Sequence, residues 1–245
     1  MDRLHRGPLR TLIAAIVGGR AVPGEQLPRE ADLAEQFGVS RATSREFIRG
    51  LEERGLISVK HGRGATVNPP ELWDKLDADV LAALLAGERR LKLLGDFLEM
   101  RRIFEIQAAG LAAERADASG VARLRAGYER MQQAAGYVST VDPDGERTFH
   151  EADVAFHRTL VELTGNETLI ALSGRIHGAM LETRQPLARP RLRVSHTLPE
   201  HERIVRAVAK GSPAAATRAM QQHLDSVGGY LEEHAAEQQR ARSSA

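Results

Sequence analysis

The chain has 245 residues, of which 42% are hydrophobic, with 34 Lys and Arg side chains against 33 Asp and Glu side chains. This length suits one large domain or two modest ones, and the apolar fraction excludes wholesale disorder. The absence of cysteine excludes disulfide frameworks, iron–sulfur clusters, thiolate zinc sites and cysteine nucleophiles. It also fits a cytoplasmic location. No membrane association is expected, because the early apolar run Leu12–Val17 is far short of the roughly 20 residues of a membrane span.

The balanced total hides an uneven distribution of charge along the chain. Residues 1–70 carry 11 basic against 8 acidic side chains, a net charge of +3, whereas residues 71–245 carry 23 against 25, a net charge of −2. The composition changes at the breaker cluster Asn68-Pro69-Pro70. We therefore predict a basic N-terminal domain over residues 1–68, a linker over 69–80, a helical domain over 81–235 and a flexible tail over 236–245.

The basic segment has the pattern of a helix-turn-helix unit. Apolar residues recur at helical spacing over residues 9–16, and a short amphipathic helix is predicted over 30–37. Gly38 suits the left-handed end of that helix, and Ser40 is a good N-cap for a third helix over roughly residues 41–54. Two helices joined by a short turn that contains glycine form a helix-turn-helix.

A basic stripe and a basic hairpin follow from the same stretch of sequence. Arg41, Arg45 and Arg49 recur every four residues, opposite the apolar face of the third helix. After it, residues 56–60 and 65–67 look like strands around a short tip, His61-Gly62-Arg63-Gly64. A helix-turn-helix followed by such a hairpin is a winged helix, which places its recognition helix in the major groove of double-stranded DNA. For the three arginines taken alone, a solvated helix face is the alternative.

Beyond the linker, the pattern is that of a helical bundle. Helices are predicted over residues 76–85, 91–115, 121–135, 146–164, 167–183, 199–209 and 213–233, with no convincing strand. The predicted fold is therefore mainly α: an N-terminal winged helix-turn-helix followed by an antiparallel all-helical bundle of six to seven helices.

Five polar side chains lie at the centre of apolar helix faces in this bundle: Arg101, Asp153, His157, His201 and His223. A buried charge is expensive, so these residues need partners. One Asp and three neutral His form a ligand set for a divalent transition metal such as zinc or nickel. Arg101 could then offer paired donors to an anionic ligand. Taken singly, a salt-bridged Asp–His pair or a satisfied core histidine is the alternative for each residue.

Two further residues are candidates for the ligand pocket. His177 faces roughly inward with its apolar neighbours. Asn166 follows Gly165 at a helix start, where capping of the helix is the alternative role.

The N-terminal domain resembles the GntR superfamily of transcription regulators. The resemblance rests on Pro23-Gly24-Glu25-Gln26-Leu27-Pro28, on Phe37-Gly38-Val39-Ser40-Arg41-Ala42-Thr43-Ser44-Arg45-Glu46, and on Gly62-Arg63-Gly64. It implies that the residues at the family's DNA-contact positions are Ser40, Arg41, Thr43, Arg45, His61, Gly62 and Arg63. A family arginine early in the second helix is replaced here by Ala31. Either Arg29 substitutes for it, or the operator preference differs.

The bundle resembles the effector domain of the FadR subfamily, the FCD domain. The resemblance rests on Asp153-Val154-Ala155-Phe156-His157, on Glu200-His201-Glu202-Arg203, and on Met220-Gln221-Gln222-His223. It implies that Asp153, His157, His201 and His223 are metal ligands, as in metal-binding members, and that Arg101 lies on the helix that binds the ligand. A weaker likeness, in residues 72–81, is to the linker of members that sense sugar acids.

These observations favour a transcription regulator over two other classes. The leading hypothesis is a homodimeric repressor, since repression is the commonest mode among such families. Its operator affinity is expected to change when a small carboxylate, such as a sugar acid, binds near the metal. A metal-dependent hydrolase is a second hypothesis, but no well-placed general base accompanies the metal set. An architectural DNA-binding protein without a ligand is the third.

Overall fold

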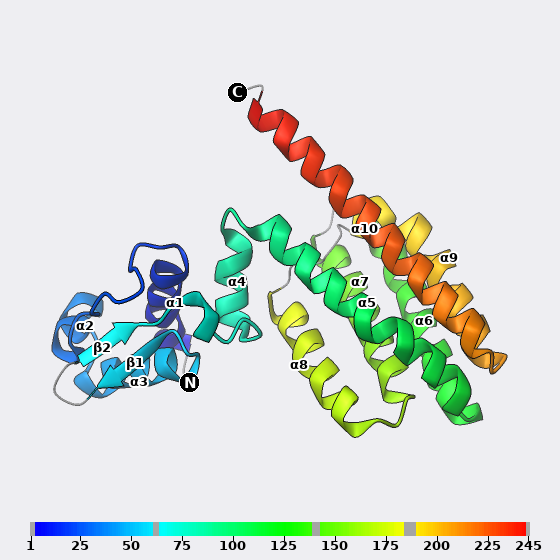
Figure 1. Ribbon diagram of the computed structural model, residues 1–245, viewed down its shortest axis with the longest axis horizontal. Coiled ribbons are helices and arrows are strands. Elements are labelled where there is room, and N and C mark those ends of the chain that lie inside the picture. Colours follow the sequence, from blue (N-terminus) through cyan, green and yellow to red (C-terminus); the bar gives the residue numbers. More distant parts are fainter. Residues whose placement is uncertain (1–2, 61–63, 139–142, 184–189, 244–245) are drawn as a thin grey trace. The chain divides into compact units, whose positions relative to one another are not determined.

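The computed structural model describes residues 3–60, 64–138, 143–183 and 190–243 (Figure 1). Within them the chain forms ten α-helices and one two-stranded sheet, which confirms the predicted mainly helical fold. Packing divides the chain into two compact units, Met1–Arg90 and Leu91–Ala245. The first contains α1 (Arg3–Val17), α2 (Glu30–Phe37), α3 (Arg41–Glu53), β1 (Ile57–Lys60), β2 (Gly64–Val67), a 3-10 turn (Pro70–Leu72) and α4 (Ala78–Ala86).

The turn between α2 and α3 forms as the sequence predicts. Gly38 ends α2 with a left-handed φ of 63°, a conformation that glycine adopts without steric cost. Ser40 caps α3, because its hydroxyl accepts the backbone N–H of Thr43 at 3.1 Å. On α3 the side chains of Phe47, Ile48 and Leu51 are buried in the core of the unit.

The wing is an antiparallel hairpin in which β1 pairs with β2. Ile57 lies opposite Val67, and Lys60 lies opposite Gly64 at the tip. The hairpin leaves α3 through Gly55, whose φ is +68° and where an added Cβ would come within 2.1 Å of the Leu72 carbonyl oxygen. Glycine is therefore required at this position for two reasons, backbone conformation and space.

The helix α4 belongs to the winged-helix unit by packing. Trp73 and Val80 are buried in the same core as α1 and α3. Arg10 on α1 pairs with Asp79 at 2.7 Å, and Arg54 pairs with Asp77 at 3.0 Å. The sequence predicts a linker over residues 69–80, because its prolines suggest a break in structure. Proline ends the strand here, but the chain turns back onto the core.

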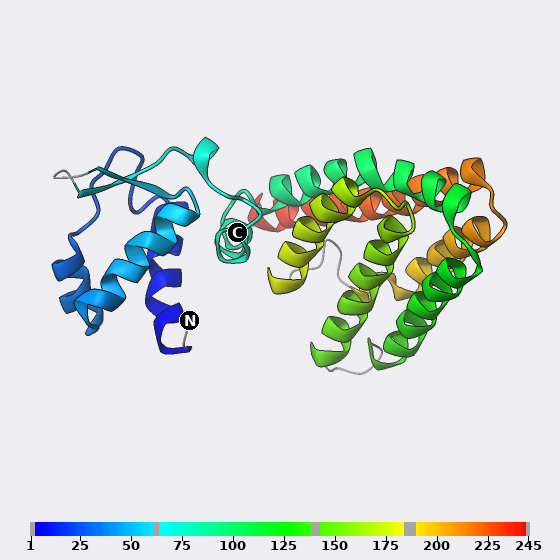
Figure 2. The ribbon, with the colours of Figure 1, turned by 90° about the horizontal axis from the view of Figure 1, so that it is seen from below.

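The second unit is an antiparallel bundle of six helices. These are α5 (Arg90–Arg115), α6 (Ala118–Val138), α7 (Pro143–Glu162), α8 (Glu167–Thr183), α9 (Pro190–Ala209) and α10 (Pro213–Ser243). Figures 1 and 2 show α10 running beside α5, and Arg102 on α5 donates to the Leu224 carbonyl of α10 at 3.4 Å. Helix α6 packs on α7 and α9, and α7 packs on α8. The central helices α7, α9 and α10 thus face a common interior.

Two helix ends differ from the sequence expectations. Helix α9 starts at Pro190 and contains Pro199, although the sequence predicts that this helix begins at Pro199. Tertiary packing can hold a helix through a proline at the cost of one backbone hydrogen bond. Helix α10 continues to Ser243, although residues 236–245 were expected to form a flexible tail. The Ala, Glu, Gln and Arg residues of that segment are good helix formers, and no glycine or proline ends the helix within it.

The packing of α4 predicts where the DNA-binding unit ends as a stable fragment. A fragment of residues 1–90 is expected to be more stable than a fragment of residues 1–68 by roughly 3 kcal/mol or more, because the shorter one loses the buried Trp73 and Val80 side chains. Urea unfolding followed by circular dichroism measures this difference. Equal midpoints for the two fragments would show that α4 adds nothing to the core.

Candidate functional site

The recognition helix α3 presents arginines to solvent. Arg41, Arg45 and Arg49 are all exposed, while the opposite face of the helix is buried. Arg45 pairs with Glu30 of α2 at 3.3 Å, and Arg49 pairs with Glu53 at 2.9 Å. Exposed pairs of this kind contribute little to stability, so a stronger anion such as a phosphate can replace the carboxylate at low cost.

A hollow of about 790 Å³ lies between α2, α3 and the wing. Its lining includes Arg29, Arg41 and Arg45, together with Gly64 from the wing. Arg29 is exposed at the start of α2, where its backbone N–H donates to the Asp32 carboxylate at 3.1 Å. The structure thus brings the predicted DNA-contact arginines of two helices to one surface. Ser40 and Thr43 lie at the start of α3, and His61, Gly62 and Arg63 lie outside the described residues.

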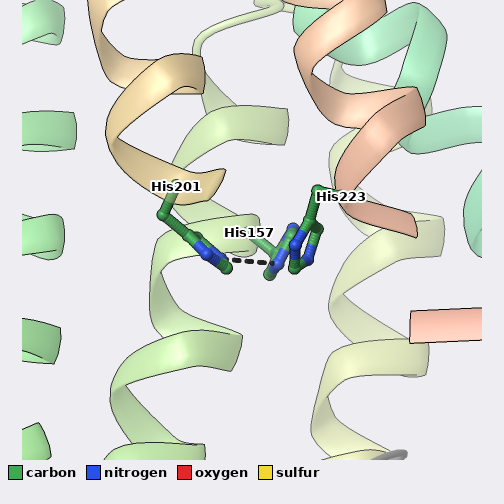
Figure 3. Close-up of side chains that lie close together, drawn as sticks. All are labelled: His157, His201 and His223. Atoms are coloured by element: carbon green, nitrogen blue, oxygen red, sulfur yellow. Dashed lines mark hydrogen bonds between the residues drawn. The ribbon is translucent and has the colours of Figure 1, made fainter. Parts of the chain in front are cut away.

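Three histidines converge in the interior of the helical unit (Figure 3). His157 comes from α7, His201 from α9 and His223 from α10, and each side chain is almost fully buried. Their metal-ligating atoms all lie within 4.8 Å of one another. The rings of His201 and His223 meet edge to face, with centroids 4.4 Å apart.

Each of these imidazoles has an acceptor beside its Nδ1 atom. His157 Nδ1 lies 2.9 Å from a Glu105 carboxylate oxygen, and His223 Nδ1 lies 2.9 Å from a Glu200 carboxylate oxygen. His201 Nδ1 lies 2.8 Å from the Thr197 carbonyl oxygen, which can only accept, so this Nδ1 carries the proton. The Thr197 contact fixes the tautomer of His201 in which Nε2 offers its lone pair. The carboxylates beside His157 and His223 favour the same tautomer in those rings.

The Nε2 atoms that result point at one another. His201 Nε2 and His157 Nε2 are 3.2 Å apart, drawn as the dashed line in Figure 3. Two lone pairs at this distance repel unless a proton or a cation lies between them. Asp153 adds a carboxylate oxygen 3.2 Å from His201 Nε2 and 3.9 Å from His157 Nε2. Three imidazole nitrogens and one carboxylate oxygen are a donor set that suits a divalent transition metal.

Glu105 is the buried acid that sequence reasoning missed. Its side chain is fully buried, and it accepts two hydrogen bonds from Arg101, from Nε at 2.7 Å and from a terminal nitrogen at 3.0 Å. His177 Nε2 also approaches it, at 3.3 Å. The one available sequence signal is the spacing of four residues between Arg101 and Glu105, which puts them on adjacent turns of α5. Glu200 carried no such signal, because its partner His223 is on another helix.

Asn166 takes a different place from the other predicted ligand residues. It is exposed at the start of α8, where its side-chain oxygen accepts the Leu169 backbone N–H at 3.1 Å. This is the capping contact weighed as the alternative. Arg101 and His177, in contrast, meet at Glu105.

The burial of these groups shifts their pKa values in ways that favour ligand binding. Burial, with a further contribution from the nearby His201, lowers the pKa of His223 to about 3, and the Glu200 contact opposes part of this shift. Burial also lowers the pKa of His157, against the opposing effect of Glu105. Burial disfavours the charged form of Glu105, yet Arg101 and His157 hold the pKa of this carboxyl well below its usual value. His157 and His223 are therefore neutral, and Glu105 is ionised, at neutral pH.

Two family models match this chain, one on each unit. The model of bacterial regulatory proteins of the gntR family matches residues 9–67, and the FCD domain model matches residues 96–226. The chain belongs to the GntR family. The two matches confirm the resemblances found in the sequence, of the N-terminal domain to the GntR superfamily and of the helical bundle to the FCD domain.

Relatives of this GntR-family chain are named as regulators. It is 36% identical over 228 residues to the HTH-type transcriptional regulator LutR of Bacillus subtilis, which spans 89% of this chain and 99% of that protein. It is 36% identical over 163 residues to the galactonate operon transcriptional repressor of Escherichia coli, 66% of this chain and 68% of that protein. It is 32% identical over 215 residues to the repressor NanR of Salmonella newport, 83% of this chain and 76% of that protein.

One solved structure shares the fold over nearly the full length. It is the protein Lar, described as controlling the agr system of Listeria monocytogenes, with a TM-score of 0.62 and 20% identity over 95% of this chain and 98% of that one. The GntR-family chain is a transcription regulator and not an enzyme, which confirms the choice between these two classes. Among the described residues, no helix is long and apolar enough to cross a membrane.

The depressed pKa of His223 predicts a loss of folding stability in mild acid. An unfolded histidine takes up a proton below about pH 6.5, whereas the folded His223 resists protonation down to about pH 3. Its contribution to stability is therefore complete above pH 6.5 and is lost as the pH falls. Between pH 7 and pH 5 the expected loss is about 2 kcal/mol for this group.

Urea unfolding of the protein in EDTA, at pH 7 and at pH 5, tests this expectation. The variant His223→Asn should lose less stability between the two pH values than the wild type does. The variant His196→Asn is a matched control, because it removes an exposed histidine that lies outside the buried cluster. An undiminished loss in His223→Asn would contradict the assignment.

Proposed function

We propose that this protein is a homodimeric operator-binding repressor of the FadR subfamily, whose FCD domain binds a divalent metal and a small organic acid that alters operator affinity. The observation that carries the proposal is the burial of Arg101 within the same polar cluster as the convergent histidines. The domain division expected from the sequence, residues 1–68 for DNA binding and 81–235 for the effector domain, is proposed with its boundary moved past α4. The DNA-binding unit is then residues 1–90 and the effector domain is residues 91–235.

Operator DNA would be bound by the arginine surface of α2, α3 and the wing. Contacts are proposed for Arg29, Ser40, Arg41, Thr43, Arg45, Arg49, His61, Gly62 and Arg63. Arg41 and Arg45 lie in the first turns of α3, where recognition helices meet base edges. A two-fold dimer matches a palindromic operator, because each recognition helix then reads one half-site.

The metal would be held by Asp153, His157, His201 and His223. Zinc and nickel suit this donor set, since both accept imidazole nitrogen together with carboxylate oxygen. A metal bound here would neutralise the Asp153 charge, remove the repulsion between facing lone pairs, and offer a positive centre to an anion. It would also tie α7, α9 and α10 together.

The effector would be a small carboxylate recognised by the Arg101 guanidinium. Guanidinium donors form paired hydrogen bonds with carboxylates, and His177 approaches the same Glu105 carboxylate as Arg101 does. A sugar acid is the favoured class, because one relative is named as the repressor of a galactonate operon. To regulate usefully, the acid must prefer one state of the dimer by a few kcal/mol.

Gel-shift titration tests the DNA-binding surface. An operator is first selected by the wild-type protein from a pool of random DNA. Arg45→Ala should weaken its binding by tenfold or more, because it removes a contact to a base or a phosphate. The control is Arg218→Ala, an exposed arginine of α10, which should leave the affinity unchanged. Equal affinities for both variants would contradict the proposed surface.

The same operator tests the acid response. D-galactonate and a panel of other small carboxylates are titrated into the complex. Arg101→Lys keeps the charge but loses the paired donor geometry, so it should abolish the response while operator binding persists. Arg102→Lys is a matched control on the adjacent residue, which pairs with Asp225 instead. If no acid shifts operator affinity, while removal of metal unfolds the helical unit, a ligandless architectural protein becomes the better explanation.

A further inference from the structure

The carboxylate of Glu105 contacts both halves of the site at once. One oxygen accepts from Arg101 Nε at 2.7 Å and lies 3.3 Å from His177. The other accepts from an Arg101 terminal nitrogen at 3.0 Å and lies 2.9 Å from His157 Nδ1. A single buried acid thus joins the arginine assigned to the effector with a histidine assigned to the metal.

We propose that Glu105 is the positioning residue that couples the two sites, so that the state of the Arg101 guanidinium sets the donor strength of His157. This inference rests on the proposed function, because that function assigns Arg101 to the acid and His157 to the metal. Glu105 itself would touch neither the acid nor the metal. Three features of the structure support it: the use of the guanidinium edges, the charge on Glu105, and the contrast with Glu200.

Glu105 leaves Arg101 able to bind a second anion. A guanidinium carries five N–H donors, and Glu105 uses the Nε–H and one terminal N–H. The other terminal edge is thereby turned in a fixed direction, without being used by this contact. Glu105 therefore orients Arg101, and an acid that binds the other edge would draw the guanidinium partly away from Glu105.

The negative charge on Glu105 affects the basicity of the His157 imidazole. A carboxylate that accepts from the far nitrogen of a ligating imidazole raises the basicity of the nitrogen that faces the metal. Arg101 competes for the same carboxylate charge through two short hydrogen bonds. Loosening Arg101 therefore strengthens the pull of Glu105 on His157 and makes Nε2 a better donor. Acid binding and metal affinity become linked through one side chain.

Glu200 provides an internal comparison. It meets His223 Nδ1 at the distance at which Glu105 meets His157, 2.9 Å in both cases. Glu200 lies on α9, whereas Arg101 pairs with Glu105 on its own helix. Both acids are expected to support metal binding, but only Glu105 should transmit a change at Arg101.

A double-mutant cycle on metal affinity tests the coupling without an effector. Zinc affinity is measured by competition with a chromogenic chelator in the full-length protein. Glu105→Gln and Glu200→Gln should each weaken zinc binding by about 10- to 100-fold, the usual effect of losing an outer partner. Arg101→Lys should tighten it at least threefold in the wild-type and Glu200→Gln backgrounds. In the Glu105→Gln background, Arg101→Lys should have no effect.

The imidazole nitrogen shifts of His157, measured by NMR in the zinc-free protein, give a second readout. Glu105→Gln should shift the Nδ1 and Nε2 signals of His157, and Glu200→Gln should shift those of His223 instead. If the two acids only filled space in the core, each substitution would not shift the signals of its own histidine and leave those of the other unchanged. Should Glu105→Gln lose its helical circular dichroism, Glu105→Asp replaces it, since it keeps the charge and shortens the side chain by one methylene.

The outcomes separate this inference from the function on which it rests. If the wild type binds no zinc or nickel, the proposed metal site fails and the coupling fails with it. If it binds metal and Glu105→Gln changes nothing, the coupling is wrong while the metal site stands. If Arg101→Lys has the same effect in all backgrounds, the two sites communicate by another route and Glu105 is not the link.

Discussion

The helical unit depends on the pairing of charges that its bundle removes from water. Arg101 and Glu105 are both buried, and an unpaired ion at that depth would cost several kcal/mol. Their two hydrogen bonds offset this cost, and His177 and His157 lie against the same carboxylate. The same requirement applies to the three convergent histidines: His157, His201 and His223 each have an acceptor beside Nδ1. A bundle held only by apolar contacts would not fix so many side-chain orientations.

Most of the fold could be predicted from the sequence because its signals are local. The cap at Ser40, the left-handed Gly38 and the period-two segments after Gly55 each act within a few residues. Local signals could not show where α9 begins, where α10 ends, or which of the two units α4 packs against. They depend on packing partners distant in the chain, such as the contact of Val80 with the core of the winged helix.

The candidate site was predictable where helical periodicity alone decides what faces inward. That periodicity selected Asp153, His157, His201 and His223, and the structure brings these side chains together. It could not show Glu105 and Glu200, since an acid on an inward face is recognisable only once its partner is known. The sequence could not decide the role of Asn166, because the same short motif fits both a pocket residue and a helix cap. In the structure its side chain makes the capping contact.

The attachment of α4 to the winged helix also defines how this regulator divides into exchangeable modules. Arg10, Arg54 and the buried Val80 fasten α4 to the DNA-binding unit, and α5 begins at Arg90. A chimera that joins this DNA-binding unit to a foreign effector domain should therefore be spliced within Gly87-Glu88-Arg89. A splice at Pro69-Pro70, although it looks natural in the sequence, would exchange α4 for a helix whose apolar face was shaped against a different core.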